Sequence, residues 1–165
     1  MCKLKSYEDM KKNTIRFYND VFHIDTEGNN YELAIQSLVM PEYMKEFNES
    51  KMKPETRIYN NGSLATLGDT VISTFLMDRY FRKEITSEQL SEYKKMATNK
   101  ELNRLGEKYL ESILFCRNYD LYYEESEGDL IQNRKGYASA FEAVIGFIYK
   151  FSKDKCDNFL LDCFK

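Results

Sequence analysis

The sequence predicts an all-α fold, and two observations carry that prediction. Hydrophobic residues recur at the three- and four-residue spacing of amphipathic helices along almost the whole chain, and no segment keeps the alternating pattern of a half-buried strand. The 165 residues include 42% hydrophobic and 31% charged side chains, seven Gly and two Pro, as in compact globular domains and unlike collagen or a disordered tail. We therefore expect one domain spanning residues 1–165.

Capping and turn signals define the helices expected in the first third of the chain. Residues 7–22 form a first helix with apolar side chains at helical spacing. Two asparagines can cap a second helix over residues 31–39, and a proline suits the first turn of a third over residues 42–48. The polar stretch 49–61, with a proline and two asparagines, is typical of a surface loop.

Three helices are expected in the middle of the chain. A long apolar helix over residues 63–81 is followed by basic residues that suit its carboxyl end. Two capping boxes, Thr-x-x-Gln and Thr-x-x-Glu, predict a short helix over residues 87–96 and a longer one over residues 99–114.

The last third combines an irregular stretch with two further helices. Residues 115–136 are polar and acidic and are longer than a usual connection, which indicates either a functional or a partly ordered segment. A second strongly apolar helix is expected over residues 137–150. Ser152 then caps a last helix that ends near Phe164.

Composition excludes several classes of protein. The formal net charge is -3, from 24 basic and 27 acidic side chains, so binding to a polyanion such as RNA must come from a local basic patch. Four cysteines without Cys-x-x-Cys spacing and a single histidine, His23, argue against structural zinc and against histidine-dependent hydrolases. No signal peptide or membrane-spanning stretch is visible, so we expect an intracellular protein, cytoplasmic or nuclear, with no membrane partner.

Two carboxylates interrupt the two most apolar helices. Asp69 follows a glycine inside the 63–81 helix, and Glu142 lies among small residues in the 137–150 helix. Burying ionised carboxylates side by side is unfavourable unless a proton or cation is shared between them. Mg²⁺ prefers oxygen ligands and keeps several waters, so one Asp and one Glu can hold it. Alternatively, each carboxylate pairs with a buried Lys, Arg or backbone amide.

Four segments resemble signatures of the ribonuclease III family, in the family's order and spacing. Residues 61–70 end in the Leu-Gly-Asp that closes its first signature, and residues 138–146 are similar to its Ala-Asp-(Ala/Thr)-Phe-Glu-Ala-Leu-Ile-Gly. Residues 38–43 resemble Leu-Thr-His-Pro-Ser-Tyr, and residues 98–102 resemble Ser-Asn-Glu-Ser-Leu. The resemblance, over about residues 15–164, implies the helical bundle of a ribonuclease III endonuclease domain.

The sequence departs from the family pattern at three acidic positions. Gly62, Ala65 and Ser139 stand where the family usually has acids, which leaves Asp69 and Glu142. The compact Mini-III branch of the family has a similar Tyr-Ser-Thr-Ala-Phe-Glu-Ala segment and a similarly reduced acidic set, and its members are active. The resemblance therefore implies that Asp69 and Glu142 are the catalytic residues and the metal ligands.

The function implied by the resemblance is hydrolysis of double-stranded RNA. The products would carry a 5′-phosphate, a 3′-hydroxyl and a short 3′ overhang, in RNA processing or silencing. Mg²⁺, or Mn²⁺ as a substitute, would be the cofactor, and the active form would be a homodimer. No double-stranded RNA-binding domain is expected after this one, so a separate RNA-binding partner could contribute affinity. The alternative, motivated by the missing acids, is an inactive ribonuclease III fold that serves as an RNA-binding or dimerisation scaffold.

Basic side chains are the candidate RNA contacts, because A-form RNA is contacted mainly through its phosphates and 2′-hydroxyls. Each of them also fits a solvated helix face. The candidates are Lys100, Arg104, Arg117, Arg134 and Lys135.

Overall fold

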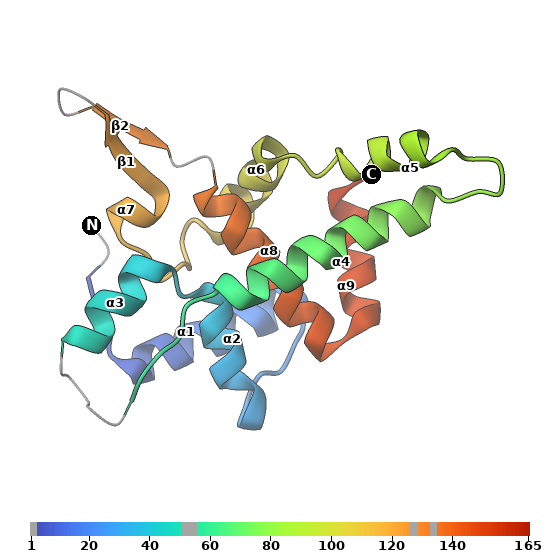
Figure 1. Cartoon of the computed structure of the whole chain (residues 1–165). Helices are drawn as coiled ribbons and strands as arrows, with labels where there is room; N and C mark the ends of the chain where they lie inside the picture. The colour runs from blue at the N-terminus through green and yellow to red at the C-terminus, as the bar shows by residue number, and fades with distance from the viewer. Residues whose placement is uncertain (1–2, 51–55, 126–128, 133–134) are drawn as a thin grey trace.

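The computed structural model describes residues 3–50, 56–125, 129–132 and 135–165, which form a bundle of α-helices with one small antiparallel strand pair (Figure 1). The first half contains α1 (Tyr7–Phe22), a 3-10 turn (Gly28–Asn30), α2 (Tyr31–Leu38), α3 (Pro41–Glu49) and α4 (Gly62–Tyr80). The second half contains α5 (Ser87–Lys94), α6 (Asn99–Leu110), α7 (Asn118–Leu121), β1 (Tyr122–Glu125), β2 (Asp129–Gln132), α8 (Gly136–Phe151) and α9 (Lys153–Cys163). The expected all-α class is confirmed.

Helices α4 and α8 cross at the centre of the bundle with their backbones in contact (Figure 1). A Cβ atom built on Gly68 would overlap the backbone carbonyl of Glu142, and one built on Gly146 would overlap the carbonyl oxygen of Leu64. Only glycine therefore fits at these two positions, and their cost in helix propensity is offset by close packing of the two helices. The crossing fixes the positions of Asp69 and Glu142 relative to each other.

Helix α6 also packs closely against α8, near the first turn of α8. Gly106 of α6 faces the backbone of Tyr137 with no room for a side chain. The side chain of Asn103 accepts a hydrogen bond from the backbone N–H of Ala138 at 3.0 Å, which satisfies one of the free donors in the first turn of α8. This buried bond ties the start of α8 to the bundle.

A set of backbone hydrogen bonds brings the starts of three helices together. The N–H of Met40 donates to the carbonyl of Phe115 at 2.9 Å, and the N–H of Phe115 donates to Leu38 at 2.9 Å. The N–H of Asn61 donates to the carbonyl of Val39 at 2.8 Å. The segments that lead into α3, α4 and α7 are therefore joined directly, although they are far apart in the sequence.

Several local predictions are refined. The Thr86 capping box is complete, whereas the Thr98 side chain caps α6 alone, because the carboxylate of Glu101 pairs with Arg104. Asn30 precedes α2 without a side-chain cap; a 3-10 turn leads into the helix instead.

The stretch 115–136, expected to be irregular, contains helix α7 and the strand pair, in which Tyr122 lies opposite Gln132. The strands are only four residues long and carry no clear alternation, so periodicity did not reveal them.

Among the described helices, none combines the length and the apolar character needed to cross a membrane.

Candidate active site

A pocket of about 670 Å³ opens where the starts of α3, α4 and α8 meet α7. Its position follows from the backbone ties between these segments. It is lined by Met40, Pro41, Glu42, Asn61, Gly62, Ala65, Thr66, Asp69, Asn99, Tyr119, Asp120, Lys135, Gly136, Ala138, Ser139 and Glu142.

Both predicted catalytic carboxylates line this pocket. Asp69 follows the glycine at which α4 touches α8, and Glu142 lies on α8 at the same contact. Glu142 is half-buried, but Asp69 is exposed, so the expectation that both carboxylates are buried is wrong for Asp69. The reason is that α4 buries only the face that packs into the bundle, while Asp69 lies on its exposed side at the pocket.

The electrostatics of this pair suit a cation. Burial, and after it the neighbouring Asp69 carboxylate, together raise the pKa of Glu142 from 4.5 to about 7. Oxygen donors whose charges repel each other fit a hard divalent ion such as Mg²⁺, which would remove the repulsion. In the described part of the chain, no group of three or more His, Cys, Asp or Glu residues is arranged to hold a metal. These two carboxylates would therefore need water or substrate oxygens to complete a coordination shell.

The raised pKa predicts that pH and Mg²⁺ act on stability together. Because the folded protein holds the Glu142 proton more tightly than the unfolded chain, the contribution of this group to stability is fully present below about pH 4.5 and is lost as pH rises through 7. We expect a loss on the order of 1 kcal/mol, since Glu142 is only half-buried and solvent screens the interaction. A Mg²⁺ ion held by the two carboxylates would compete with that proton, so its stabilising effect should grow with pH.

Thermal unfolding with EDTA and with Mg²⁺, at pH 5.5 and pH 8, checks this expectation. Mg²⁺ should raise the melting temperature more at pH 8. The Glu142→Gln variant, which has no titrating group at this position, should show neither the decline in EDTA nor the growth of the Mg²⁺ effect. An equal Mg²⁺ effect at both pH values in the parent protein would contradict the assignment.

The three positions that lack the family's acids lie in the same pocket. Gly62 and Ala65 lie in the first turns of α4, and Ser139 lies one turn before Glu142 on α8. The fold thus brings together the positions inferred from two separate sequence motifs. What differs from the family pattern is the number of carboxylates at these positions.

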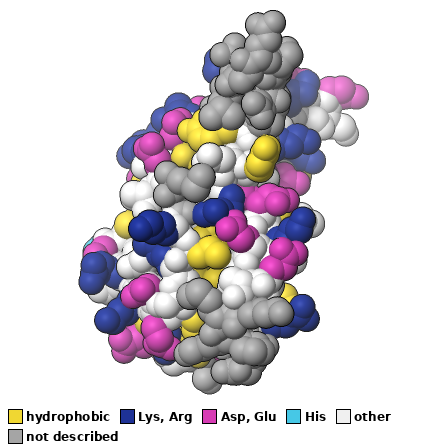
Figure 2. All heavy atoms as spheres, turned by 90° about the vertical axis from the view of Figure 1, so that its left-hand side faces the viewer, with side chains coloured by type: hydrophobic (Ala, Val, Ile, Leu, Met, Phe, Trp, Pro, Cys, Tyr) yellow, Lys and Arg dark blue, Asp and Glu magenta, His cyan; other side chains and the backbone are white. Residues whose placement is uncertain are grey.

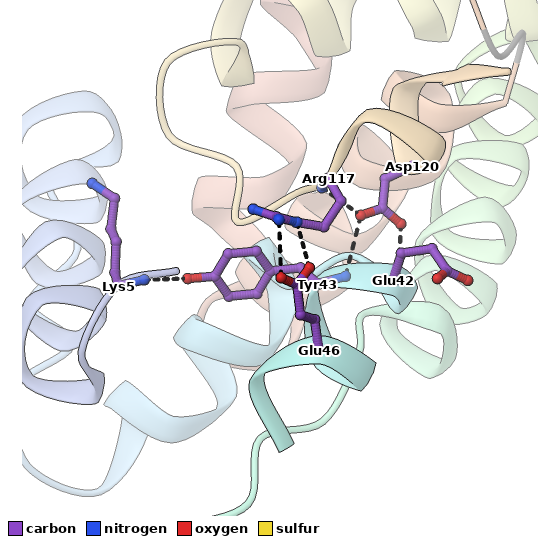
Figure 3. Close-up of polar contacts among 6 residues, drawn as sticks. All are labelled: Lys5, Glu42, Tyr43, Glu46, Arg117 and Asp120. Carbon is purple, nitrogen blue, oxygen red and sulfur yellow. Dashed lines mark hydrogen bonds and ion pairs between the residues drawn. The ribbon is translucent and has the colours of Figure 1, made fainter. Parts of the chain in front are cut away.

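Asp120 is a pocket residue that the sequence did not single out. Its carboxylate accepts hydrogen bonds from the backbone N–H groups of Glu42 at 3.0 Å and Tyr43 at 3.3 Å, and from that of Arg117 at 2.8 Å (Figure 3). Burial raises its pKa, while these three backbone bonds oppose the rise. Asp120 therefore caps the start of α3 from a distant part of the chain, a role with no local signal because its partners lie more than seventy residues away.

Removing this carboxylate should loosen one wall of the pocket. Asp120→Ala would leave buried donors of α3 without acceptors, and we expect it to lower the free energy of unfolding by about 2–3 kcal/mol. Asp120→Asn, which keeps one acceptor oxygen, should cost less. Urea unfolding of the three proteins measures the difference. Equal stability of the alanine variant and the parent would show that the cap is not needed.

Of the predicted RNA contacts that the structure describes, one lines the pocket and the others lie elsewhere. Lys135 lines it, at the start of α8. Arg117 is directed to α3 instead, where its Nη2 donates to Glu46 at 2.9 Å and its side chain is 20% exposed (Figure 3). Arg104 pairs with Glu101 on α6, and Lys100 lies exposed at the start of that helix. Arg134 lies outside the described residues.

On the side of the molecule shown in Figure 2, the described residues form no broad basic patch that would mark it as an RNA-binding face. Figure 2 shows basic and acidic side chains interspersed over the side of the molecule that lies at the left in Figure 1, with small hydrophobic areas between them. This mixed surface agrees with the formal net charge of -3. Attraction of a polyanion to this face would therefore depend on individual contacts.

A family model matches more than half of the chain. It is described as "Ribonuclease III domain" and matches residues 62–153, from the start of α4 through α8 to the first residue of α9. The matched range includes both carboxylates and the three positions without acids. No curated protein matches the chain significantly.

Proposed function

Because this chain belongs to the ribonuclease III family, whose domain indicates endoribonuclease action on double-stranded RNA, we propose that it is a metal-dependent endoribonuclease. The reaction would hydrolyse phosphodiester bonds of duplex RNA and leave a 5′-phosphate, a 3′-hydroxyl and a short 3′ overhang. The observation that carries the proposal is the convergence of Asp69 and Glu142 in one pocket at the α4–α8 crossing.

In this proposal Asp69 and Glu142 hold a Mg²⁺ ion, or Mn²⁺ in its place. When bound, such an ion polarises the phosphate and lowers the pKa of a coordinated water. The shortage of protein carboxylates fits Mg²⁺ in particular, since it retains waters and is commonly held by one or two carboxylates together with substrate phosphate. Glu142 must lose its proton to act as a ligand, which its pKa of about 7 permits near neutral pH.

At the start of α8 the pocket offers a local positive charge to an RNA phosphate, beside the carboxylates of its other walls. Lys135 lies at the start of α8, a helix of sixteen residues whose first turn faces the pocket through Gly136, Ala138 and Ser139. The amino end of a helix carries partial positive charge and favours an anion. We assign Lys135 to phosphate contact, and Lys100 and Arg104 on α6 to outer contacts with the duplex.

A second copy of the chain would complete the enzyme. A groove of about 510 Å³ between α4 and the α8–α9 region is lined by Leu67, Val71, Phe75, Tyr149 and Leu161. Tyr149 is 38% exposed and Leu161 43% exposed, so the groove presents apolar side chains that a second copy could cover. Homodimerisation would cover this groove, and a solution molar mass near twice 19.6 kDa by light scattering is expected.

The pocket positions without acids favour one alternative, an inactive fold that acts as an RNA-binding or dimerisation scaffold. Gly62, Ala65 and Ser139 remove the carboxylates with which the family pattern would surround the metal. A scaffold would bind duplex RNA without cutting it.

A cleavage assay separates the enzyme from the scaffold. Long duplex RNA is incubated with the protein and Mg²⁺, Mn²⁺ or EDTA, and the products are separated on a denaturing gel and tested for a 5′-phosphate. The enzyme predicts fragments with 5′-phosphates in Mg²⁺ or Mn²⁺ and intact RNA in EDTA. Intact RNA under all three conditions, with folded protein in excess, would favour the scaffold.

A further inference from the structure

A second pocket lies away from the candidate active site, against α1 and α2. It has a volume of about 560 Å³, within the roughly 300–1,000 Å³ usual for ligand pockets. Tyr7 of α1, Tyr31 at the start of α2, and Arg57 and Tyr59 of the segment before α4 are among its lining residues. We call this pocket the tyrosine groove.

The segment that carries Arg57 and Tyr59 is held firmly in place. Asn48 of α3 brackets Ile58 with two hydrogen bonds: its Nδ2 donates to the Ile58 carbonyl at 3.0 Å, and its Oδ1 accepts from the Ile58 N–H at 3.0 Å. Gln36 of α2 donates to the carbonyl of Asn60 at 3.1 Å. Because the backbone is fixed on both sides of Tyr59, its ring is presented with little loss of main-chain freedom on binding.

Along this segment one side chain is buried and anchors the chain, while its two neighbours are exposed to solvent. Ile58 is 4% exposed and packs into the core, whereas Arg57 is exposed and Tyr59 is 66% exposed. An aromatic ring and a guanidinium on the two sides of a buried anchor form a pair of planar groups suited to stacking. No folding role is evident for a tyrosine ring left this far in water.

The groove also carries a second aromatic group with a positive charge beside it. The ammonium of Lys11 lies 4.1 Å from the centroid of the Tyr31 ring. Glu32 also lines the groove and would repel a phosphate close to it. The groove therefore favours a flat, uncharged group stacked on the exposed Tyr59 ring, with its phosphate near Arg57.

The groove is connected to the candidate active site by the chain itself. Asn61 and Gly62, which directly follow the Arg57–Asn60 segment, line the candidate active site, and the segment runs beside α1 and α2 to the start of α4 (Figure 1). Gly62 lies three positions after Tyr59, a span of at most roughly 10 Å. An RNA strand leaving the active site could therefore reach the tyrosine groove within a few nucleotides.

The geometry points to the tyrosine groove as a stacking site for unpaired nucleotides that flank the duplex. This inference rests on the proposed function, because the RNA must first be held at the carboxylate pocket. A protein partner would also use exposed Tyr and Arg side chains. RNA is favoured because the segment that carries Tyr59 leads directly into Asn61 and Gly62 of that pocket. Among the described residues of the groove, Tyr59 is also the large hydrophobic side chain that is strongly exposed.

The test compares two RNAs: a blunt duplex and the same duplex with a short single-stranded extension that carries 2-aminopurine, whose fluorescence falls when it stacks. Binding is measured in EDTA so that no RNA is cut. We expect the extended duplex to bind about tenfold more tightly, with quenching of 2-aminopurine. Tyr59→Ala should remove the preference and the stacking signal that the protein produces, while Tyr59→Phe should keep both.

A matched control is provided by the double variant Phe81→Ala/Arg82→Ala. Phe81 is 66% exposed, the same fraction as Tyr59, and Arg82 is an exposed arginine beside it. This variant should keep the preference, whereas Arg57→Ala/Tyr59→Ala should lose it. Thermal unfolding confirms that each variant is folded.

The outcomes distinguish the two proposals. Equal binding of both RNAs by the parent, or a preference that survives Tyr59→Ala, would overturn the stacking site and leave the groove to a protein partner. Both results are compatible with a nuclease, since the blunt duplex still binds. Failure of every RNA to bind in EDTA would overturn the stacking site, whereas the proposed function is judged separately by cleavage in Mg²⁺ or Mn²⁺.

Discussion

Asp69→Asn and Glu142→Gln are each expected to lower the rate of duplex cleavage by at least about a thousandfold, because loss of a metal ligand removes several kcal/mol of transition-state stabilisation. The substitutions change one oxygen to nitrogen and keep the side-chain shape, so duplex binding should persist. Gly62, Ala65 and Ser139, which line the same pocket, supply no carboxylate that could take the place of the lost ligand. Single-turnover cleavage with saturating protein measures the chemical step directly.

Glu42→Gln supplies the matched control. Glu42 lines the same pocket from the start of α3, and its backbone N–H, which the substitution leaves in place, binds Asp120. Its variant should cut RNA within a few-fold of the parent rate. If Asp69→Asn and Glu142→Gln cut as fast as Glu42→Gln, the two carboxylates are not metal ligands and the proposed mechanism is wrong.

Loss of activity in Glu142→Gln should coincide with a gain in stability in the absence of metal. Burial and the Asp69 charge raise the Glu142 pKa, so ionising this group opposes folding above about pH 7. A neutral amide avoids that penalty. A residue that lowers the stability of the folded protein is expected at a site that serves binding or catalysis rather than folding.

The sequence predicted the features that depend on neighbouring residues, such as helices and short motifs. Helix periodicity and capping residues located the bundle, and the two motifs around Asp69 and Glu142 indicated residues that the fold does bring together. The exposed position of Asp69 was missed because an apolar pattern alone does not show which face of α4 meets α8. Asp120 was missed because a side chain that caps a helix more than seventy residues away leaves no local signal.

The strand pair illustrates the same limit. The two strands pair with each other, and four residues each are too few to show an alternating pattern in the sequence. The two hydrogen bonds between the Asn48 side chain and the Ile58 backbone could likewise not be predicted, because an asparagine near the end of a helix is usually taken for a surface residue. Tertiary hydrogen bonds of this kind decide how the tyrosine groove is built.

Gly68→Ala is expected to damage both stability and activity, because the α4–α8 contact leaves no room for a methyl group. The new Cβ would overlap the backbone carbonyl of Glu142, and backbone cannot move aside as the end of a side chain can. Separating the two helices should lower the free energy of unfolding by about 3 kcal/mol.

The same separation moves Glu142 away from Asp69, so cleavage by the fraction that remains folded should fall by about a hundredfold, as expected for a displacement near 1 Å. Gly62→Ala is the control, because its Cβ would meet only the Oδ1 atom of Asn60, at 3.0 Å. Its stability should lie within about 0.5 kcal/mol of the parent. Parent-like stability and activity in Gly68→Ala would mean that the crossing tolerates a wider spacing, and that backbone contact does not set the distance between the two carboxylates.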